Sequence, residues 1–510
     1  MNHVLSRHRW IIGASAMLAL ALMAGLSSGL FSSHQAFAAP LAVQLKQLSS
    51  DPYTNSSSQH KTEVEPDTFS YGSTIVVSFQ AGRFYSGGGS SNIGWATSTD
   101  GGTTWKNGFL SGITVYAGGT YKRASDPAVA YDAAHNAWLI SSLALSIKNN
   151  TMVGVAVLVS RSTDGGITWS KPIVVASGGS SDNLDKEWVV CDETASSPYY
   201  GHCHVEWDNR NLNSRIFMSI SSDGGLTWAS PKSPPNQTFA ALGGQPLVQP
   251  GGAVIVPIYG TDLTTNIDHI YSYTSTNGGT SWNTPVAVSP VTFHVQQATY
   301  RGGSLPSAEI DQAGTVYVVW ADCRFEANCS AGDIVMTTSS DGVNWTAVQR
   351  IPIDLIGSGV DHFTAGIAVD KSTAGRGAHL ALTYYYFANT NCTNTTCQLY
   401  AGFVSSLNGG ASWSTSVQLA GPMQLAWLAN TTDGYMTGDY ISTSIVGSQA
   451  FPGFPVAFAP QKGKLAEATY TAALNVIGGP VKTTRDAILV APHARMGTMP
   501  GSKPGQSISS

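Results

Sequence analysis

The sequence is poor in charged residues and lacks the common motifs of metal-, nucleotide- and serine-dependent enzymes. Asp, Glu, Lys and Arg make up 11% of the 510 residues, and the formal net charge is −5. Lys and Arg form no cluster of the kind that binds nucleic acid. There is no HExxH, no P-loop and no nucleotide-binding glycine signature, and "GGSLPS" (302–307) lacks the spacing of a hydrolase elbow. We expect no nucleic-acid partner and no cofactor.

Long apolar runs are absent after the N-terminal region. Arg7 and Arg9 precede an apolar run over 10–31, and Ala36-Phe37-Ala38 offers a small-x-small cleavage site. This pattern predicts a secretory signal peptide over 1–38, with an uncleaved membrane anchor as the alternative. The mature chain is then secreted and extracellular, with no membrane span.

Cysteine is also scarce, and every cysteine lies after the predicted leader. An even number in an exported chain predicts disulfides. Six cysteines allow fifteen pairings, of which the local scheme is the most economical: Cys191–Cys203, Cys323–Cys329 and Cys392–Cys397. His202-Cys203-His204 could also suggest a metal site, but no second ligand cluster has the spacing of a zinc site. We therefore expect no bound metal.

One short polar turn is abundant instead. "STDGGTTW" (98–105) recurs in six copies, whose closing tryptophans are 54 to 68 residues apart. The copies are marked by Asp100 and Trp105, Asp164 and Trp169, Asp223 and Trp228, Asn277 and Trp282, Asp341 and Trp345, and Asn408 and Trp413. A period near sixty in an all-β pattern predicts a β-propeller with blades of four antiparallel strands.

The chemistry of the turn fits a structural role in each blade. Asp or Asn can hydrogen-bond its own backbone, and the glycines accept a positive φ. Tryptophan then buries a large apolar surface, with its N–H free to find a partner. We expect each turn to join the third strand of a blade to the fourth.

The number of blades follows from two incomplete pieces. Strand-like segments at 440–447, 450–458 and 465–474 come after the last turn, and no further turn follows them. The segment 41–50 is a strand without a blade. Joining the two pieces closes the circle and pairs every edge. This predicts a propeller over 39–478 with seven blades favoured and six as the alternative, followed by a disordered tail over 479–510.

Strand alternation gathers unusual residues on one face of such a propeller. We call this the near face: first strands begin there and second strands end there, while the repeated turns lie on the opposite, far face. Stiff loops on a rigid scaffold are where binding and catalytic sites tend to lie. The near-face candidates are Arg83, Arg123, Asp126, Asp185, Lys186, Glu187, Arg210, Arg301, Arg324, Asp361, His362, Asp439 and Tyr440. For any one of them, a role in capping a turn is the competing interpretation.

The repeated turn is the Asp box, Ser-x-Asp-x-Gly-x-Thr-Trp, which the copies beginning at Ser98, Ser162 and Ser221 match fully. The chain thereby resembles the sialidase (neuraminidase) superfamily of Asp-box, or BNR-repeat, propellers, whose sialidases have six blades. The resemblance implies a secreted, monomeric glycoside hydrolase of the exo-α-sialidase kind. Its substrate would be an extracellular glycan with an anionic sugar, sialic or uronic acid.

The same resemblance suggests roles for individual residues. Tyr440 would be the nucleophile, Glu187 its partner or a base, and Asp126 the acid/base. The further candidates would bind substrate: Arg83, Arg123, Arg301, Arg324, Asp361, His362 and Asp439. One departure is clear, because the first inner strand, "VEPDTFSYG" (64–72), lacks the family's Arg-Ile-Pro motif. The alternative is therefore a non-catalytic propeller that binds carbohydrate or protein.

Overall fold

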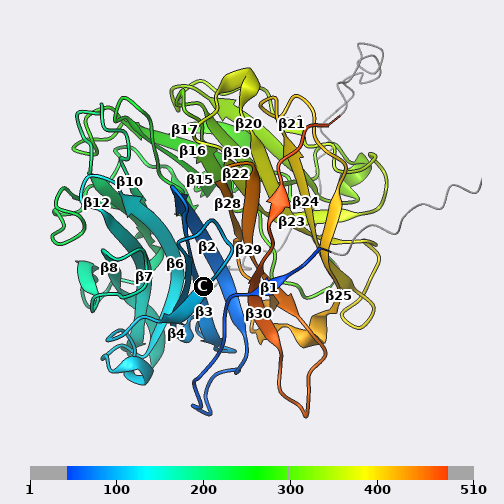
Figure 1. Cartoon of the computed structure of the whole chain (residues 1–510), viewed down its shortest axis with the longest axis horizontal. Helices are drawn as coiled ribbons and strands as arrows, with labels where there is room; N and C mark the ends of the chain where they lie inside the picture. Colours follow the sequence, from blue (N-terminus) through cyan, green and yellow to red (C-terminus); the bar gives the residue numbers. More distant parts are fainter. Residues whose placement is uncertain (1–42, 297, 480–510) are drawn as a thin grey trace, which may run out of the picture. The chain divides into compact units, whose positions relative to one another are not determined.

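The computed structural model describes residues 43–296 and 298–479, so the predicted signal peptide and all but the first residue of the predicted tail lie outside the described residues. The described part consists of β-strands and five short 3-10 turns, without an α-helix (Figure 1). Within it, no helix has the length and apolar character needed to cross a membrane. The predicted all-β class is confirmed for this part of the chain.

The strands form antiparallel sheets, most of them four-stranded, which we number in chain order. The first two sheets are joined by one pairing, Ser90 with Ala124. Sheet 1 contains β2 (Glu63–Tyr71), β3 (Thr74–Arg83), β4 (Ser90–Ser98) and β5 (Lys106–Phe109). Sheet 2 contains β6 (Arg123–Asp132), β7 (Ala137–Lys148), β8 (Thr151–Ser162) and β9 (Ile173–Ser177).

Sheets 3 and 4 are less regular. Sheet 3 contains β10 (Leu184–Cys191), β11 (Cys203–Asn209) and β12 (Arg215–Ser221), and a bridge between Met218 and Lys232 stands in place of a fourth strand. Sheet 4 contains β14 (Leu247–Val248), β15 (Val254–Asp262), β16 (Asp268–Ser275) and β17 (Val286–Pro290), with β13 (Phe239–Leu242) also paired to β15.

The remaining sheets complete the series. Sheet 5 contains β18 (Ser307–Ile310), β19 (Val316–Asp322), β20 (Asp333–Ser339) and β21 (Gln349–Arg350). Sheet 6 contains β22 (Asp361–Val369), β23 (Leu380–Phe387), β24 (Gln398–Ser406) and β25 (Val417–Gln424). Sheet 7 contains β28 (Ser442–Val446), β29 (Gln449–Ala457), β30 (Glu467–Thr471) and β1 (Lys46–Gln47), with β31 (Leu474–Asn475) paired to β29.

Smaller elements lie between the sheets. β26 (Ala429–Thr431) and β27 (Gly434–Met436) form a hairpin between sheets 6 and 7 in the chain. The 3-10 turns are η1 (Val115–Ala117), η2 (Arg210–Leu212), η3 (Ala327–Cys329), η4 (Gly375–Gly377) and η5 (Leu425–Trp427).

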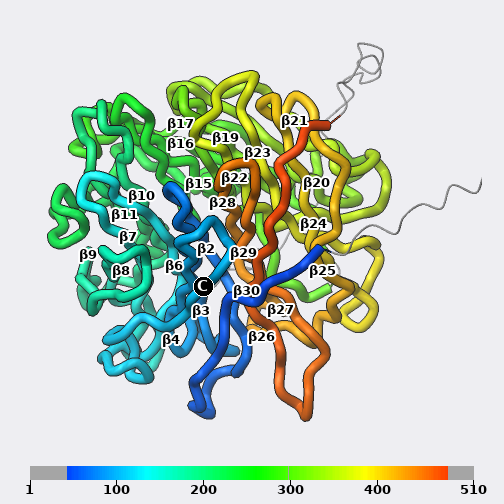
Figure 2. The backbone as a smooth tube through the Cα atoms, in the orientation of Figure 1, coloured from blue at the N-terminus to red at the C-terminus, as the bar shows by residue number. Residues whose placement is uncertain are grey.

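The N-terminal strand pairs with the last sheet, as predicted. Lys46 lies opposite Thr471, and Gln47 lies opposite Tyr470. β1, in blue, therefore runs beside β30, in orange (Figures 1 and 2). The pairing joins the two ends of the described chain and covers the edge that β30 would otherwise expose.

The first strands of successive sheets contact one another in a cycle. β2 contacts β6, β6 contacts β10, β10 contacts β14, and β14 contacts β18. β18 then contacts β22, β22 contacts β28, and β28 returns to β2. Apolar side chains fill the spaces between neighbouring sheets; for example, Met218 of sheet 3 packs in one cluster with Val256 and Tyr271 of sheet 4. The first strands are thus held edge to edge by a shared core.

Each Asp box joins the third strand of its sheet to the fourth-strand position, which confirms the predicted placement. In the first box the Asp100 carboxylate accepts hydrogen bonds from Ser98 Oγ and Thr104 N, both at 2.8 Å. Trp105 Nε1 donates to the carbonyl of Gly102 at 2.9 Å. Counting the first box, this tryptophan hydrogen bond is present in four of the six boxes. In the other two, Nε1 of Trp228 and of Trp282 has no partner within the described residues.

The boxes also hold neighbouring sheets together through one glycine. The second glycine of a box has a positive φ, such as 84° at Gly102 and 78° at Gly166. A β-carbon on Gly166 would lie 2.9 Å from Val76 of sheet 1, and one on Gly102 would overlap Phe451 of sheet 7. Glycine is required here because each box packs directly against the preceding sheet. The contact with Phe451 extends this arrangement from sheet 1 back to sheet 7.

All three predicted disulfides are confirmed: Cys191–Cys203, Cys323–Cys329 and Cys392–Cys397. Cys191 and Cys203 are directly opposed on β10 and β11. The other two bridges close short loops. Every cysteine of the chain is therefore paired, and His202-Cys203-His204 offers no free thiolate to a metal.

Candidate functional site on the near face

Four first strands carry a β-bulge close to their near-face ends. The pairing register shifts in β2, β6, β10 and β22, and each shift contains a non-glycine residue with a positive φ. The four φ angles are 52° at Glu65, 51° at Asp126, 40° at Lys186 and 45° at Thr364. Such a conformation costs about 1–3 kcal/mol and is found mostly at functional sites. In three of the four sheets, the strained residue is ionisable.

These bulges bring ionisable side chains from several sheets into one group, which we call the charge cluster. Each member interacts electrostatically with at least one other member. The charge cluster consists of Glu65, Arg83, Asp126, Lys186, Glu187, Arg301, Asp439 and Tyr440. Six of these were predicted site residues, and Lys186 was among the near-face candidates.

Arg301 lies at the edge of the charge cluster beside a cavity of about 620 Å³, the near-face cavity. Its guanidinium donates to both carboxylate oxygens of Asp439, with Nε 2.7 Å from Oδ1. Nη1 is 3.7 Å from Asp433, a longer and weaker contact. Burial would lower the pKa of Arg301, but Asp439 outweighs it and the pKa is raised. Arg301 is therefore a fixed cation, held by Asp439, whose Nη1 makes a longer contact with Asp433.

Arg83 and Glu65 lie behind Arg301 in the interior. Arg83 is only 1% exposed and donates to the carbonyl of Gly89 at 2.7 Å and to the sulfur of Met436 at 3.3 Å. Glu65 accepts a hydrogen bond from the Gln80 amide. Burial, with Asp126 and Asp439 nearby, raises the pKa of Glu65 to about 8, so this carboxyl is protonated at neutral pH.

Asp126 and Glu187 are buried acids whose carboxyl oxygens have no hydrogen-bond partner among the described residues. Burial raises the pKa of Asp126 to about 6, with Lys186 opposing the shift and Asp185 and Asp439 adding to it. Burial, with Asp126 nearby, raises the pKa of Glu187 well above its ordinary value. Burying carboxyl groups without hydrogen-bond partners lowers the stability of the fold. Stability therefore does not explain why these two acids are present.

Tyr440 lies deeper, in a stack with Lys186 and Trp188. The Lys186 ammonium is 3.8 Å from the centre of the Tyr440 ring and 4.6 Å from that of Trp188. The Tyr440 hydroxyl donates to the carbonyl of Pro127 at 2.9 Å. Burial and the surrounding carboxyls raise the pKa of Tyr440 well above 10. In this arrangement the phenol is a hydrogen-bond donor to the backbone.

Four predicted site residues make contacts outside the charge cluster. Arg123 donates to the carbonyls of Ser86 and Gly88 and lies over the ring of Phe84. Arg324 pairs with Asp322. Asp361 accepts from His294, 3.1 Å away, and from the backbone of Gly332, whose carbonyl contacts the buried His362 ring. These hydrogen bonds and ion pairs stabilise loops, as the competing interpretation of the candidates expects.

One group of side chains has the composition of a metal site. Ligand atoms of Asp333, Asp354 and His362 lie within 4.8 Å of one another. The guanidinium of Arg350 pairs with both carboxylates and is 2.7 Å from Asp333. Because the guanidinium of Arg350 already pairs with both acids, the geometry does not favour a metal ion in this position.

Sequence reasoning missed Glu65 as a site residue. The family motif draws attention to an arginine in the first inner strand, where this chain has an acid instead. The available signal was a carboxylate followed by proline at the start of two successive inner strands, Glu65-Pro66 and Asp126-Pro127. Both pairs form the bulges described above.

Comparison with known proteins gives the following. A family model described as a BNR repeat-like domain matches residues 151–369. No curated protein matches the chain. Solved structures similar to it include a Hadza microbial sialidase (15% identity; 76% of this chain and 74% of the other; TM-score 0.44). A Trypanosoma rangeli sialidase in complex with sialic acid is also similar (15%; 72% and 59%; 0.44). So is an ulvan lyase from a polysaccharide lyase family (11%; 87% and 98%; 0.48).

The TM-scores of these three structures are all below 0.5, so they carry no argument about the chemistry of this chain. The family match covers the second to fifth boxes and the strands around them. Over residues 151–369 the chain matches the BNR repeat-like domain, and it thus resembles the sialidase superfamily of BNR-repeat proteins.

Proposed function

We propose that this chain is a secreted glycoside hydrolase with a seven-bladed propeller fold, and that it acts on an extracellular glycan carrying an anionic sugar. The cyclic contacts of the first strands and the packing of Gly102 against Phe451 support closure with seven blades. Three disulfides that pair every cysteine support an oxidising, extracellular location. We expect the protein to act as a monomer.

The observation that carries the enzymatic proposal is the state of Asp126. Its carboxyl is fully buried, its backbone is strained and its two oxygens have no hydrogen-bond partner among the described residues. A carboxyl whose pKa is raised to about 6 can keep a proton and deliver it to a leaving-group oxygen. Glu187, a second unpaired acid in the same cluster, supplies the carboxyl that such hydrolysis requires.

Arg301 is the residue we propose for recognising the anionic group. Nη1 faces Asp433 at 3.7 Å, too far for a strong ion pair, beside the near-face cavity. A sugar carboxylate could displace Asp433 and bind Arg301 at closer range. Asp439 would hold the guanidinium in position, while the buried Arg83 would balance the acids behind it.

The test is a panel of fluorogenic glycosides that includes sialosides and uronides, assayed with the wild type and with Asp126→Asn. We expect release from at least one anionic glycoside by the wild type and a large loss with Asp126→Asn. No release from any member at high enzyme concentration contradicts the proposal.

A second candidate function, a carbohydrate-binding propeller without turnover, is favoured by Tyr440. Its hydroxyl is bound to the Pro127 carbonyl and not to a carboxylate, so a base that could activate it as a nucleophile is not in contact. Binding of anionic glycans on an array, without any product by mass spectrometry, would establish this function in place of hydrolysis.

A further inference from the structure

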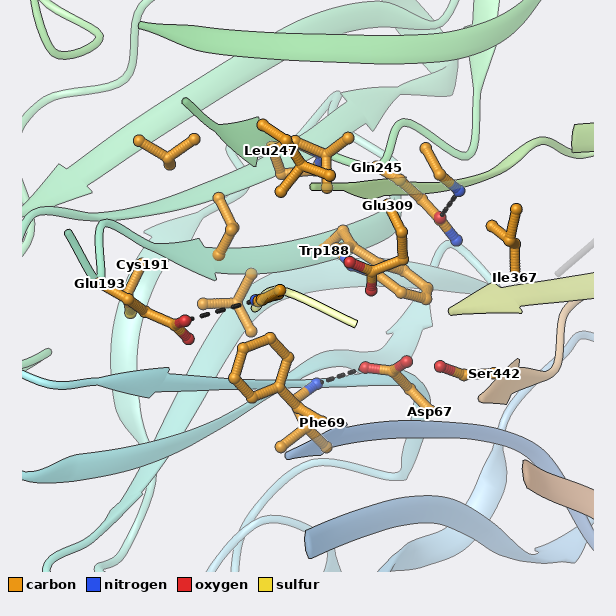
Figure 3. Close-up of a pocket in the computed structure, with 18 of the residues that line it drawn as sticks. Asp67, Phe69, Trp188, Cys191, Glu193, Gln245, Leu247, Glu309, Ile367 and Ser442 are labelled. Carbon is orange, nitrogen blue, oxygen red and sulfur yellow. Dashed lines mark hydrogen bonds and ion pairs between the residues drawn. The ribbon is translucent and has the colours of Figure 1, made fainter. Parts of the chain in front are cut away.

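A second cavity adjoins the charge cluster on its far-face side. It occupies about 340 Å³ between the far-face ends of the first strands and is lined by residues of β2, β10, β14, β18 and β22. Its walls include Asp67, Trp188, Gln245, Glu309 and Lys371 (Figure 3). We call it the far-face cavity. A volume of this size is at the lower end for ligand sites, which begin at about 300 Å³, and suits a ligand of one sugar ring.

The far-face cavity is acidic. Asp67 and Glu309 extend their carboxyl groups into it from opposite walls, as Figure 3 shows. Glu193 forms a third acidic wall and is 3.4 Å from the Lys371 ammonium. Lys371 is the cation among the lining residues, and it lies over the ring of Phe69 at 4.1 Å. With Asp311, the lining has four acids against one ammonium, and this balance repels an anionic ligand.

One polar side chain in this cavity has unused hydrogen-bonding capacity. Gln245 is 6% exposed, and its amide oxygen accepts from the backbone nitrogen of Ala308 at 2.7 Å. Its amide nitrogen has no hydrogen-bond partner among the described residues. Because Gln245 lines the cavity, this amide donor can donate to an acceptor bound there, such as a hydroxyl oxygen.

The cavity is separated from the charge cluster by packed side chains. Trp188 lines the far-face cavity and contacts Tyr440 edge to face, with ring centres 5.2 Å apart. Lys186 covers the other side of this pair. Among the described residues, three ligand atoms lie within 4.8 Å of one another only in the group Asp333, Asp354 and His362. The carboxyl groups of the cavity do not form such a group. The acids are therefore not spaced to hold a metal ion.

We propose that the far-face cavity is a binding site for a hydroxylated amine in its protonated form, with an amino sugar as the ligand class. The ammonium would donate to Asp67 and Glu309, and a hydroxyl oxygen would accept from Gln245. The ring would lie against Trp188, as apolar sugar faces do on aromatic side chains. This site goes beyond the proposed hydrolase function and does not depend on it.

The test uses three sugars that differ only at carbon 6: 6-amino-6-deoxyglucose, glucose and glucuronate. Binding is measured calorimetrically at about pH 8, where an alkylamine like that of lysine is still protonated. We expect the amino sugar to bind roughly tenfold more tightly than glucose, and glucuronate to bind more weakly still. Glu309→Gln should reduce binding of the amino sugar by roughly tenfold, because it removes one carboxylate without changing side-chain size.

Two further variants serve as controls. Asp341→Asn removes a carboxylate in an Asp box, at a position where two other boxes have asparagine, and should leave binding unchanged. Lys371→Met removes the competing ammonium and should tighten binding of the amino sugar. Both variants and Glu309→Gln are first checked for an unchanged melting curve or circular dichroism spectrum.

Three results would overturn the proposal. The first is no binding of the amino sugar at millimolar concentration. The second is binding that Glu309→Gln and Lys371→Met both leave unaltered, because the amine then lies elsewhere. The third is a Glu309-dependent preference for glucuronate. Glucuronate binding that is insensitive to Glu309→Gln belongs to the near face and bears on the proposed hydrolase function alone.

Discussion

The near face and the far-face cavity are built on the same first strands, yet they have opposite chemistry. On β2, Glu65 belongs to the charge cluster, and Asp67, two residues later, lines the far-face cavity. On β10, Lys186 and Glu187 belong to the charge cluster, and Trp188 lines the cavity. Three cations balance the acids on the near face, whereas one cation faces four acids in the far-face cavity. A short stretch of strand can therefore serve two sites, because a bulge changes which way successive side chains point.

The largest expected effect is that of Asp126→Asn, which should impair the near face and leave the far-face cavity unaltered. Asp126→Asn should lower kcat on an anionic glycoside by about 10²–10⁴, the usual contribution of a general acid. Stability should be unchanged or higher, because an unpaired buried carboxyl is replaced by a neutral group of the same size. Steady-state kinetics and a melting curve measure the two quantities.

In the same variant, binding of the amino sugar to the far-face cavity should be unchanged. A loss of amino-sugar binding would show that the two regions are one site. Full activity of Asp126→Asn on a substrate cleaved by the wild type would remove Asp126 from the mechanism.

A change in an Asp box should affect the fold and neither site. Trp413 is 6% exposed and donates to the carbonyl of Gly410 at 3.0 Å. Trp413→Ala should lower the free energy of unfolding by about 3–5 kcal/mol, as for other buried tryptophans. Chemical denaturation measures this loss. Altered affinity in the molecules that remain folded would mean that the boxes contribute to binding.

The acids of both regions predict how stability depends on pH. Burial raises the pKa of Glu65 to about 8 and those of Asp67 and Glu309 to about 7. An acid whose pKa is higher in the folded state contributes stability that is lost as pH rises through the folded pKa. The melting temperature should therefore fall as pH rises from about 4, near the unfolded pKa of these acids, to about 8, and level off above that.

At the acidic end, the exposed boxes act in the opposite direction. Hydrogen bonds from Thr104 lower the pKa of Asp100 to about 2, so its contribution is present above the unfolded pKa and is lost as pH falls toward 2. Scanning calorimetry from acidic to alkaline pH measures the melting temperature and tests both expected changes. A melting temperature that rises from neutral to alkaline pH would contradict the assignment of buried, protonated acids.

A smaller effect should come from Lys186, which lies between the two regions. Lys186 lowers the pKa of Asp126, so Lys186→Met should raise that pKa. If Asp126 acts as a protonated acid, activity declines as pH rises through its pKa, and this decline should move to higher pH in the variant. The pH profile of kcat measures the shift. If activity instead rises through this pKa, and that rise moves to higher pH in the variant, Asp126 acts as a base.

The sequence predicted the repeated parts of this molecule better than the unrepeated ones. The boxes, the pairing of the N-terminal strand with the last sheet and the disulfides are local or periodic patterns, and all are confirmed. Arg301, Glu187 and Tyr440 also lie in one cluster as expected, while their roles remain predictions.

Other features were not predicted from the sequence. The roles of Arg324 and Asp361 remain predictions. Arg324 pairs with Asp322, two residues away, whereas Asp361 pairs with His294, which only the folded chain brings near it. The bulge at Glu65 shifts the pairing register, and spacing alone does not reveal a register shift. Glu309 and Asp67 are separated by more than 200 residues, so the far-face cavity depends on how the first strands come together.

The most direct test of the central claim, that opposite ends of the same strands select opposite charges, is to locate the matched sugars in crystals. Crystals of the wild type would be soaked separately with glucuronate and with 6-amino-6-deoxyglucose. We expect glucuronate beside Arg301 in the near-face cavity, and the amino sugar between Asp67, Gln245 and Glu309. Both sugars at the same end, or the two positions exchanged, would contradict the account.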